Sequence, residues 1–371
     1  MLRSIGKTCF AYAYTLTDAR RFFPRQSEGT TPFIICYHRV VENFQRSAAV
    51  AIPSMLISTR MLERQIDWLA QRFDIMSLDE LGSHLENERT FQRRPAAVTF
   101  DDGYCDVYRH AYPLLRRKGI PAAFFVVTGL VDTGRPQLFD RLYLLLSMLQ
   151  RRGAPLGLTV GRVLDSIGIQ ARGIKQLDSL GNDAFGIMTA VLTIVPRQQL
   201  ETAVTELENE LSLKTDLLDE MTPLSWEMIQ TMYRGGMTIG SHTQSHLLLT
   251  TETLKTAKTE LAESRQMLES YLDAPVRHFA YPDGRFNAAI LQAVHQAGYA
   301  FGYGICNSRD QNYPLLTIPR KVLWERSCVN AFGKFSSAVM NCHANSAFDL
   351  GGRCVHDHVS IREEVIQGKM A

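Results

Sequence analysis

Short apolar runs alternate with longer amphipathic segments along most of the chain. The runs have the length of buried strands, whereas the segments repeat their apolar residues every three or four positions, as helices do. Strands are predicted at 33–37, 96–100, 122–127, 237–240, 279–281, 299–305 and near 315–322. Helices are predicted at 60–72, 81–88, 106–118, 225–234, 253–271 and 287–296. This α/β alternation predicts a parallel sheet covered by helices, either a barrel or a doubly wound sheet.

The alternation is interrupted at about 129–222. This segment is rich in Leu, Gln, Arg and Gly, and its clearest patterns are helical. We interpret it as a largely helical insertion, either a lid over a site or a packing subdomain without a role in chemistry. The insertion divides one α/β unit at 33–326. A helical or flexible segment at 1–32 precedes that unit, and a loosely ordered tail at 327–371 is expected after it.

Composition and charge exclude several classes of protein. Lys and Arg number 40 and Asp and Glu 38, so a net charge of +2 provides no basic surface for nucleic acid. No run approaches the roughly 18 apolar residues of a membrane span. The first 21 residues lack a clear signal-peptide cleavage site, although a weak amphipathic helix there could cap the fold or contact a membrane surface peripherally. Seven cysteines without a C-x-x-C pair are interpreted as reduced thiols of a cytoplasmic protein.

Cysteines and histidines also occur close together in the tail. Cys342 precedes His343, and Cys354, His356 and His358 alternate with other residues. These spacings match no common structural zinc pattern. We therefore expect no metal site in the tail.

Two predicted strands end in residues that suit metal-dependent chemistry. Asp101 and Asp102 follow the strand at 96–100, and His242 and His246 follow another strand. Asp and Gly are ordinary turn residues, but adjacent carboxylates repel each other unless a positive group lies close to them. Two imidazoles and one carboxylate bind a zinc-like divalent cation and leave positions for water and substrate. The other carboxylate would serve as a base for a water molecule that attacks a carbonyl carbon.

A third strand end supplies a candidate acid. An amine that leaves from an amide must receive a proton. His38 follows the strand at 33–37, and among the remaining histidines the topology places it best for this role. The predicted site therefore combines a base, an acid and a metal.

Three motifs resemble those of the polysaccharide deacetylases, the NodB-homology domain of carbohydrate esterase family 4. They are Thr99-Phe100-Asp101-Asp102-Gly103, His242-Thr243-Gln244-Ser245-His246 and Phe279-Ala280-Tyr281-Pro282-Asp283-Gly284. The resemblance extends over about 33–325, apart from the insertion. It implies a distorted (β/α) barrel of about seven strands that removes acetyl groups from N-acetylated amino sugars. By this resemblance Asp101 is the catalytic base, and Asp102, His242 and His246 bind one divalent metal, Zn²⁺ before other transition metals.

The acid motif departs from the usual pattern of this family. Most members carry a Leu-x-His motif near the C-terminus, and no comparable strand of this chain contains one. Tyr37-His38 is similar to the version in circularly permuted members, where the strand has moved to the front. The resemblance therefore also implies His38 as the acid.

The third motif departs from the pattern as well. Ala280 stands where the family has an arginine that orients the base, and Arg277 lies too far upstream. Arg320, near the end of a later strand, could substitute for it. Asp283 replaces a tyrosine, but its backbone N–H can still serve an oxyanion. Tyr281 is a further candidate contact to the oxyanion or substrate.

Three functions are compatible with these residues. The first is removal of N-acetyl groups from the amino sugars of a glycan or of a sugar-linked precursor. The same site could instead cleave an O-acetyl ester or an N-formyl group. The third is an inactive glycan-binding protein on the same fold, which the presence of the base and all three metal ligands disfavours.

Overall fold

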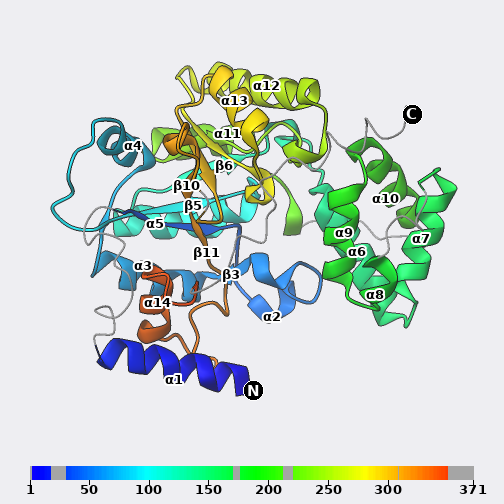
Figure 1. The fold of residues 1–371 in the computed structure, drawn as a ribbon, viewed down its shortest axis with the longest axis horizontal. Coiled ribbons are helices and arrows are strands. Elements are labelled where there is room, and N and C mark those ends of the chain that lie inside the picture. The colour runs from blue at the N-terminus through cyan, green and yellow to red at the C-terminus, as the bar shows by residue number, and fades with distance from the viewer. Residues whose placement is uncertain (1, 18–30, 170–175, 212–219, 308, 350–371) are drawn as a thin grey trace.

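A parallel sheet that is nearly closed into a barrel forms the centre of the molecule (Figure 1). The computed structural model describes residues 2–17, 31–169, 176–211, 220–307 and 309–349. The order of the strands is β10-β9-β8-β7-β6-β5-β1-β11, and β4 pairs with β5. Their bounds are β1 Phe33–Tyr37, β4 Asp74–Ile75, β5 Pro95–Phe100, β6 Ala123–Val126, β7 Thr238–Ser241, β8 His278–Ala280, β9 Phe301–Gly304, β10 Ile318–Pro319 and β11 Lys321–Val322.

One kinked segment joins the two edges of this sheet. β10 pairs with β9 and β11 pairs with β1, and only Arg320 separates β10 from β11 along the chain. Residues 318–322 therefore act as one strand that pairs with both edges. When these two short strands are counted as one and β4 is left out, the ring has seven strands. The predicted α/β barrel of about seven strands is thus confirmed.

Helices cover the outside of the barrel, while its interior is filled by side chains. The outer helices are α3 Thr59–Ala70, α5 Tyr112–Lys118, α11 Trp226–Arg234, α12 Leu254–Leu272 and α13 Ala288–Gln296, whereas α4 Leu78–Glu86 packs against the residues inside the ring. Alternate strand residues face opposite sides, so Ile35 and Val98 pack in the outer core, whereas Ile34 and Ala97 pack inside the ring. A π-helix at Val107–Ala111 precedes α5.

Short elements complete the barrel. β2 Arg39–Val41 and β3 Leu56–Ser58 form a separate two-stranded parallel sheet, and α2 Phe44–Ser47 lies between them in the chain. Side-chain caps fix several helix starts. Ser77 and Glu80 form the capping box that opens α4, and the Ser225 side chain caps α11.

The insertion forms a helical cluster beside the barrel, on the right in Figure 1. Its helices are α6 Leu138–Arg151, α7 Leu156–Ser166, α8 Gln176–Ser179, α9 Ala184–Ile194 and α10 Arg197–Leu211. Their apolar faces form a separate core that also includes Leu56 and Tyr104 of the barrel unit. The largely helical character of the insertion agrees with the prediction, and the shared core attaches it to the side of the barrel that carries the site.

The expectation of a loosely ordered tail is wrong for residues 327–349. α14, Ser337–Ala344, packs against α1, Leu2–Leu16 (Figure 1). Val339 and Cys342 are buried with Ala11 and Tyr14 of α1. An eight-residue helix is too short for a clear apolar period, and the surface that covers it comes from the opposite end of the chain. Residues 350–371, which include Cys354, His356 and His358, lie outside the described residues.

No helix in the described part of the chain is both long and apolar enough to cross a membrane.

Candidate metal centre and catalytic pocket

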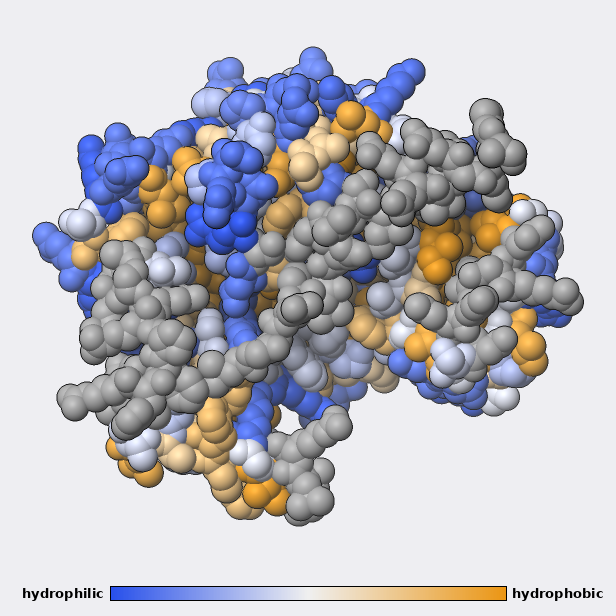
Figure 2. Space-filling view, in the orientation of Figure 1, coloured by the Kyte–Doolittle hydropathy of each residue, from blue (hydrophilic) through white to orange (hydrophobic). Residues whose placement is uncertain are grey.

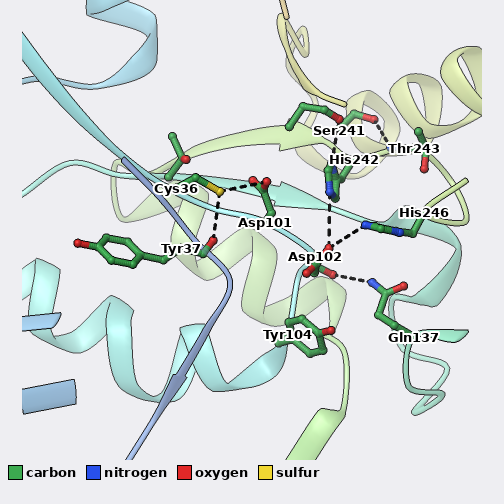
Figure 3. A network of polar contacts seen from close by, with 12 residues as sticks. Cys36, Tyr37, Asp101, Asp102, Tyr104, Gln137, Ser241, His242, Thr243 and His246 are labelled. Carbon is green, nitrogen blue, oxygen red and sulfur yellow. Dashed lines mark hydrogen bonds and ion pairs between the residues drawn. The ribbon is translucent and has the colours of Figure 1, made fainter. Parts of the chain in front are cut away.

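The candidate site lies at the mouth of the barrel where the parallel strands end (Figure 3). Cys36 of β1 is in register with Thr99 of β5, and both face the ring interior. Because alternate residues share a face, His38 and Asp101 are the next inward-facing positions of these two strands. His242 follows β7 in the same way. The strand ends thus bring together residues from distant parts of the sequence.

Asp102, His242 and His246 form a compact cluster of potential metal ligands. Their ligand atoms all lie within 4.8 Å of one another. Oδ1 of Asp102 is 3.1 Å from Nε2 of His246 and 3.5 Å from Nε2 of His242. The carboxylate is buried, and neither of its oxygens accepts a hydrogen bond from any residue that the structure describes. Both imidazoles point toward it in Figure 3.

The tautomer of His242 explains why this cluster fits a cation. Its Nδ1 is 2.8 Å from the carbonyl oxygen of Ala280, which can only accept, so Nδ1 carries the proton. Burial lowers the pKa of His242 to about 4, so the ring is neutral near pH 7. Its Nε2 then directs a lone pair at a carboxylate oxygen. A divalent cation between these atoms would convert a repulsive contact into an attractive one.

Arg320 separates the role of Asp101 from that of Asp102. Its Nη1 and Nη2 each donate to one carboxylate oxygen of Asp101, both at 2.7 Å, and Nη1 also donates to Thr99 Oγ1 at 3.1 Å. Burial opposes ionisation of Asp101, but the guanidinium outweighs it and holds the pKa of this carboxyl well below its usual range. Asp101 is therefore ionised, and its oxygens are already engaged.

A second group of potential ligands, Cys36, His38 and Asp101, does not suit a metal. The Cys36 thiol donates a hydrogen bond to Oδ2 of Asp101 at 3.3 Å. Burial raises the pKa of this thiol well above its usual value, so the thiolate that a metal requires is disfavoured. The bidentate ion pair with Arg320 occupies the carboxylate. These contacts leave His38 as the group in this cluster that is available to a substrate.

His38 lines the same cavity as the cluster of potential ligands. The residue is partly exposed, and its Nδ1 is buried without a hydrogen-bond partner among the described residues. A ring nitrogen of His38 lies within 4.8 Å of an Asp101 carboxylate oxygen. This arrangement leaves an ionisable ring on the cavity wall.

The two candidates of the third motif differ in what they can offer a substrate. Tyr281 donates its hydroxyl to the Leu316 carbonyl at 2.9 Å and its backbone N–H to the Tyr303 carbonyl at 3.1 Å. It therefore contributes its ring to the cavity wall, while both of its donors are engaged elsewhere. Asp283 lines the cavity with a φ of 54°, and its carboxylate accepts a hydrogen bond from Arg285.

The backbone is strained where the potential ligands sit. Asp102, Thr243 and His246 have φ values of 73°, 69° and 57°, in the left-handed region that residues other than glycine rarely adopt. Each such residue costs about 1–3 kcal/mol, and such residues cluster at functional sites. The strain in both motifs is thus consistent with a site that holds its ligands in a fixed geometry.

The family model described as polysaccharide deacetylase matches residues 88–155 and 193–302. These ranges include both aspartates and both histidines of the site. The chain belongs to the polysaccharide deacetylase family. The circular permutation of its first strand stays a prediction.

The chain is similar to several curated proteins and solved structures. One relative is YxkH of Bacillus subtilis, which is provisionally named as a polysaccharide deacetylase. It is 20% identical over 67% of this chain and 58% of its own length. A poly-β-1,6-N-acetyl-D-glucosamine N-deacetylase of Staphylococcus aureus is 32% identical over 25% of this chain and 34% of its own. The chain thus spans less than two thirds of either relative.

The solved structures agree in fold. The deacetylase PplD of Streptococcus pyogenes, in complex with acetate, superposes with a TM-score of 0.52 at 18% identity, over 81% of this chain and 95% of its own. BC0361 of Bacillus cereus, a polysaccharide deacetylase, has a TM-score of 0.51 at 14% identity, over 85% and 69% of the two chains. At these identities the likeness shows the fold alone.

The sequence interpretation missed the residue that anchors the two histidines of this deacetylase-like site. Glu260 of α12 accepts hydrogen bonds from the backbone N–H groups of Gln244 and Ser245 at 3.0 and 2.9 Å, and from the Ser245 hydroxyl at 2.7 Å. A glutamate at a buried position of α12, next to Leu261, is the signal that would have identified it. Glu260 fixes the loop between the two imidazoles.

The insertion also reaches the site. Gln137 donates its side-chain amide to the backbone carbonyl of Asp102 at 3.2 Å (Figure 3), and the Phe139 ring packs 4.9 Å from that of His246. Tyr104 donates its hydroxyl to Asp140 of α6 at 2.6 Å, and burial raises the pKa of this aspartate to about 7. The start of α6 and the residue directly before it thus contact both the Asp-Asp motif and one of the histidines.

Barrel and insertion together enclose a cavity of about 460 Å³. Its floor carries Asp101, Asp102, His38 and the two histidines of the cluster. Residues of α6, α9 and α10 form another part of its wall. A substrate that reaches the cluster of potential ligands therefore also contacts the insertion.

Proposed function

We propose that the protein is a metal-dependent hydrolase that removes N-acetyl groups from the amino sugars of a glycan or glycan precursor. The observation that carries this proposal is the division of labour between the two aspartates. Asp102 presents unpartnered oxygens to two imidazole nitrogens, whereas Asp101 is held ionised by Arg320 at the same cavity. Family membership and the named deacetylase relatives support the choice of reaction.

In this proposal Asp102, His242 and His246 hold one divalent cation, with Zn²⁺ favoured by a donor set of two imidazoles and one carboxylate. When bound, the cation supplies a water molecule of lowered pKa and polarises the substrate carbonyl. The neutral His242 and the buried carboxylate orient the ligand atoms, and Glu260 fixes the loop between the histidines.

The remaining residues would move protons. Asp101 stays ionised near neutral pH, so its carboxylate accepts the proton of the attacking water. His38 lies on the same wall and donates a proton to the amine nitrogen as the amide C–N bond breaks. The products are acetate and the free amine. The backbone N–H of Asp283 is the candidate donor to the developing oxyanion.

Bound metal and acetate release test this proposal together. We expect about one zinc ion per chain in the purified protein, and acetate release from N-acetylglucosamine oligomers and glycosides. His242→Ala should lose the metal, whereas Asp101→Asn should keep it and lose at least about 10²-fold in turnover, the effect of removing a positioned base. A folded, metal-replete protein that releases no acetate from any of these compounds would contradict the proposal. Retained turnover in Asp101→Asn would contradict the role of that residue.

The acid separates amides from esters. An alkoxide leaves with less help than an amine, so His38→Ala should slow N-acetyl hydrolysis by about 10²-fold or more while slowing an O-acetylated sugar much less. N-formyl sugars provide the third substrate in the same assay. Faster turnover of the O-acetyl or N-formyl compound by the unmodified protein would favour that alternative reaction at the same site.

A further inference from the structure

One wall of the cavity is more apolar than deacetylation of a sugar requires. Helix α9 directs Phe185, Met188 and Leu192 to the cavity, at positions i, i+3 and i+7 of a single face. Thr189 and Thr193 line the cavity from the same face, but their hydroxyls donate to backbone carbonyls of α9 itself at 2.9 and 2.7 Å. The α9 face, defined by these five residues, therefore presents mainly carbon atoms.

Several further apolar residues line the cavity around the α9 face, together with the charged Arg197 and Glu252. Ile52, Met55 and Trp324 line the cavity from loops of the barrel unit, and Leu247 and Leu248 line it directly after the second histidine. The apolar lining is continuous with the cluster of potential ligands, because Leu247 follows His246 in the chain. A molecule whose reacting group lies at the cluster can thus extend an apolar part along α9.

The α9 face is a feature of this chain beyond the shared family pattern. The family model matches residues 88–155 and 193–302, so nearly all of α9 falls in the segment between the two matches. Phe185 remains 47% exposed, which continues the apolar lining to the surface of the insertion. Figure 2 shows apolar residues at the surface in this part of the molecule, on the right of the view.

We propose that the α9 face holds an apolar chain joined to the amino sugar, so that the preferred substrate is a glycolipid. This inference rests on the proposed function and names the substrate class of the same site. Sugar hydroxyls need hydrogen-bond partners when they leave water, and the α9 face offers almost none. Each methylene that is fully buried there would instead improve binding by about fourfold.

A series of alkyl glycosides tests the inference. Acetate release is measured for methyl, butyl and octyl glycosides of N-acetylglucosamine, each below the concentration at which it forms micelles, with the metal-loaded full-length protein. We expect kcat/KM to rise by about tenfold or more from methyl to octyl. Leu192→Gln should abolish most of this rise, so that the octyl glycoside loses far more in kcat/KM than the methyl glycoside does.

Ile194→Gln is the matched control. Ile194 lies on the same helix and is 40% exposed, but it does not line the cavity. Its variant should keep the full dependence on chain length. Equal kcat/KM for the methyl and octyl glycosides in an active enzyme would overturn the inference. A second series of methyl glycosides carries N-acyl groups of increasing length. The inference would also be overturned if kcat/KM rose with chain length only in this series, because the apolar wall would then bind the acyl group and not the aglycone.

A binding measurement separates failure of this inference from failure of the proposed function. A bromooctyl N-acetylglucosaminide should quench the fluorescence of Trp324, which lines the cavity, and Trp324→Phe identifies that part of the signal. If no glycoside is hydrolysed but quenching persists and weakens in Leu192→Gln, the proposed reaction fails and the apolar site stands. If acetate is released without quenching and without a dependence on chain length, the apolar site fails and the reaction stands.

Discussion

Two adjacent aspartates acquire different environments because a single arginine lies beside one of them. Arg320 occupies both oxygens of Asp101, whereas both oxygens of Asp102 lack hydrogen-bond donors among the described residues. Arg320 sits at the kink between β10 and β11, the segment that joins both edges of the sheet. The residue that orients the proposed base is therefore positioned by closure of the barrel itself.

Removal of Arg320 should destabilise the protein and inactivate it. Both partners of the ion pair are almost fully buried, with side-chain exposures of 0% and 4%. Arg320→Met would leave a buried carboxylate without its cationic partner, at a cost of about 3–5 kcal/mol in the free energy of unfolding. Urea denaturation in the presence of a chelator measures this loss without a contribution from metal binding.

A double variant tests whether the uncompensated charge causes this loss. Arg320→Met combined with Asp101→Asn removes the charge as well as its partner, so part of the lost stability should return. If Arg320→Met alone unfolds within about 0.5 kcal/mol of the unmodified protein, or if the double variant is the less stable of the two, the ion pair does not have the assigned role.

Residue-level prediction from the sequence depends on signals that are local. Asp101 and Asp102 are adjacent at the end of an apolar run, and His242 and His246 are four residues apart, so each pair is recognisable in a short window. Arg320 and Asp101 are 219 residues apart in the sequence. From the sequence, Arg320 is only a candidate to replace the arginine that orients the base. The sequence around Arg320 is typical of a strand end and contains no sign of its partner.

At the scale of elements, the loop between the two histidines depends on a neighbouring helix. Two backbone N–H groups of this loop donate to Glu260 of α12 and would lose their partner in a Glu260→Ala variant. Residues that orient metal ligands typically change metal affinity by 10–100-fold when they are lost. We expect a weakening of this size in Glu260→Ala, measured by competition with a chromogenic chelator.

Glu263→Ala provides the control on the same helix. Glu263 is exposed one turn further along α12, so its loss should leave metal affinity unchanged. Equal metal affinities in Glu260→Ala and the unmodified protein would show that the loop keeps its geometry without this carboxylate.

Elements were predictable where their start signals are local. The capping box of Ser77 and Glu80 is visible in four residues, and the structure forms it. α14 was missed because its eight residues bury their apolar side chains against distant partners: Val339 and Cys342 against α1, and Met340 in the core of the barrel unit. Short elements that depend on distant partners carry little signal in their own sequence.

At the scale of the whole molecule, α1 and α14 join the two ends of the described chain in one small cluster. His343 of α14 has its Nε2 3.0 Å from the Ser327 carbonyl, and Lys7 of α1 donates to the same oxygen at 2.7 Å. Burial, together with the charges of Lys7 and Lys321, lowers the pKa of His343 to about 4, although Ser327 and Asp349 oppose this. The folded cluster therefore requires a neutral ring.

This requirement makes the cluster sensitive to acid. The unfolded chain binds a proton at His343 below its ordinary pKa of 6.5, whereas the folded chain does so only below about 4. Between these values the unfolded state binds more protons, so stability falls as the pH falls. The free energy of unfolding is not reduced by His343 above pH 6.5. Below that pH the free energy of unfolding falls by about 1.4 kcal/mol per pH unit, and the total loss reaches about 3 kcal/mol near pH 4.

His343→Gln isolates this effect from the histidines of the metal cluster, which also titrate. Glutamine keeps an N–H donor for the Ser327 carbonyl but carries no titratable group. Urea unfolding from pH 7 to pH 4.5 should therefore show a smaller loss of stability in the variant than in the unmodified protein. The protection factors for hydrogen exchange in α1, which are corrected for the slower intrinsic exchange at low pH, should fall on acidification only where His343 is present. Parallel stability curves for the two proteins would mean that protonation of His343 does not control the packing of α1 on α14.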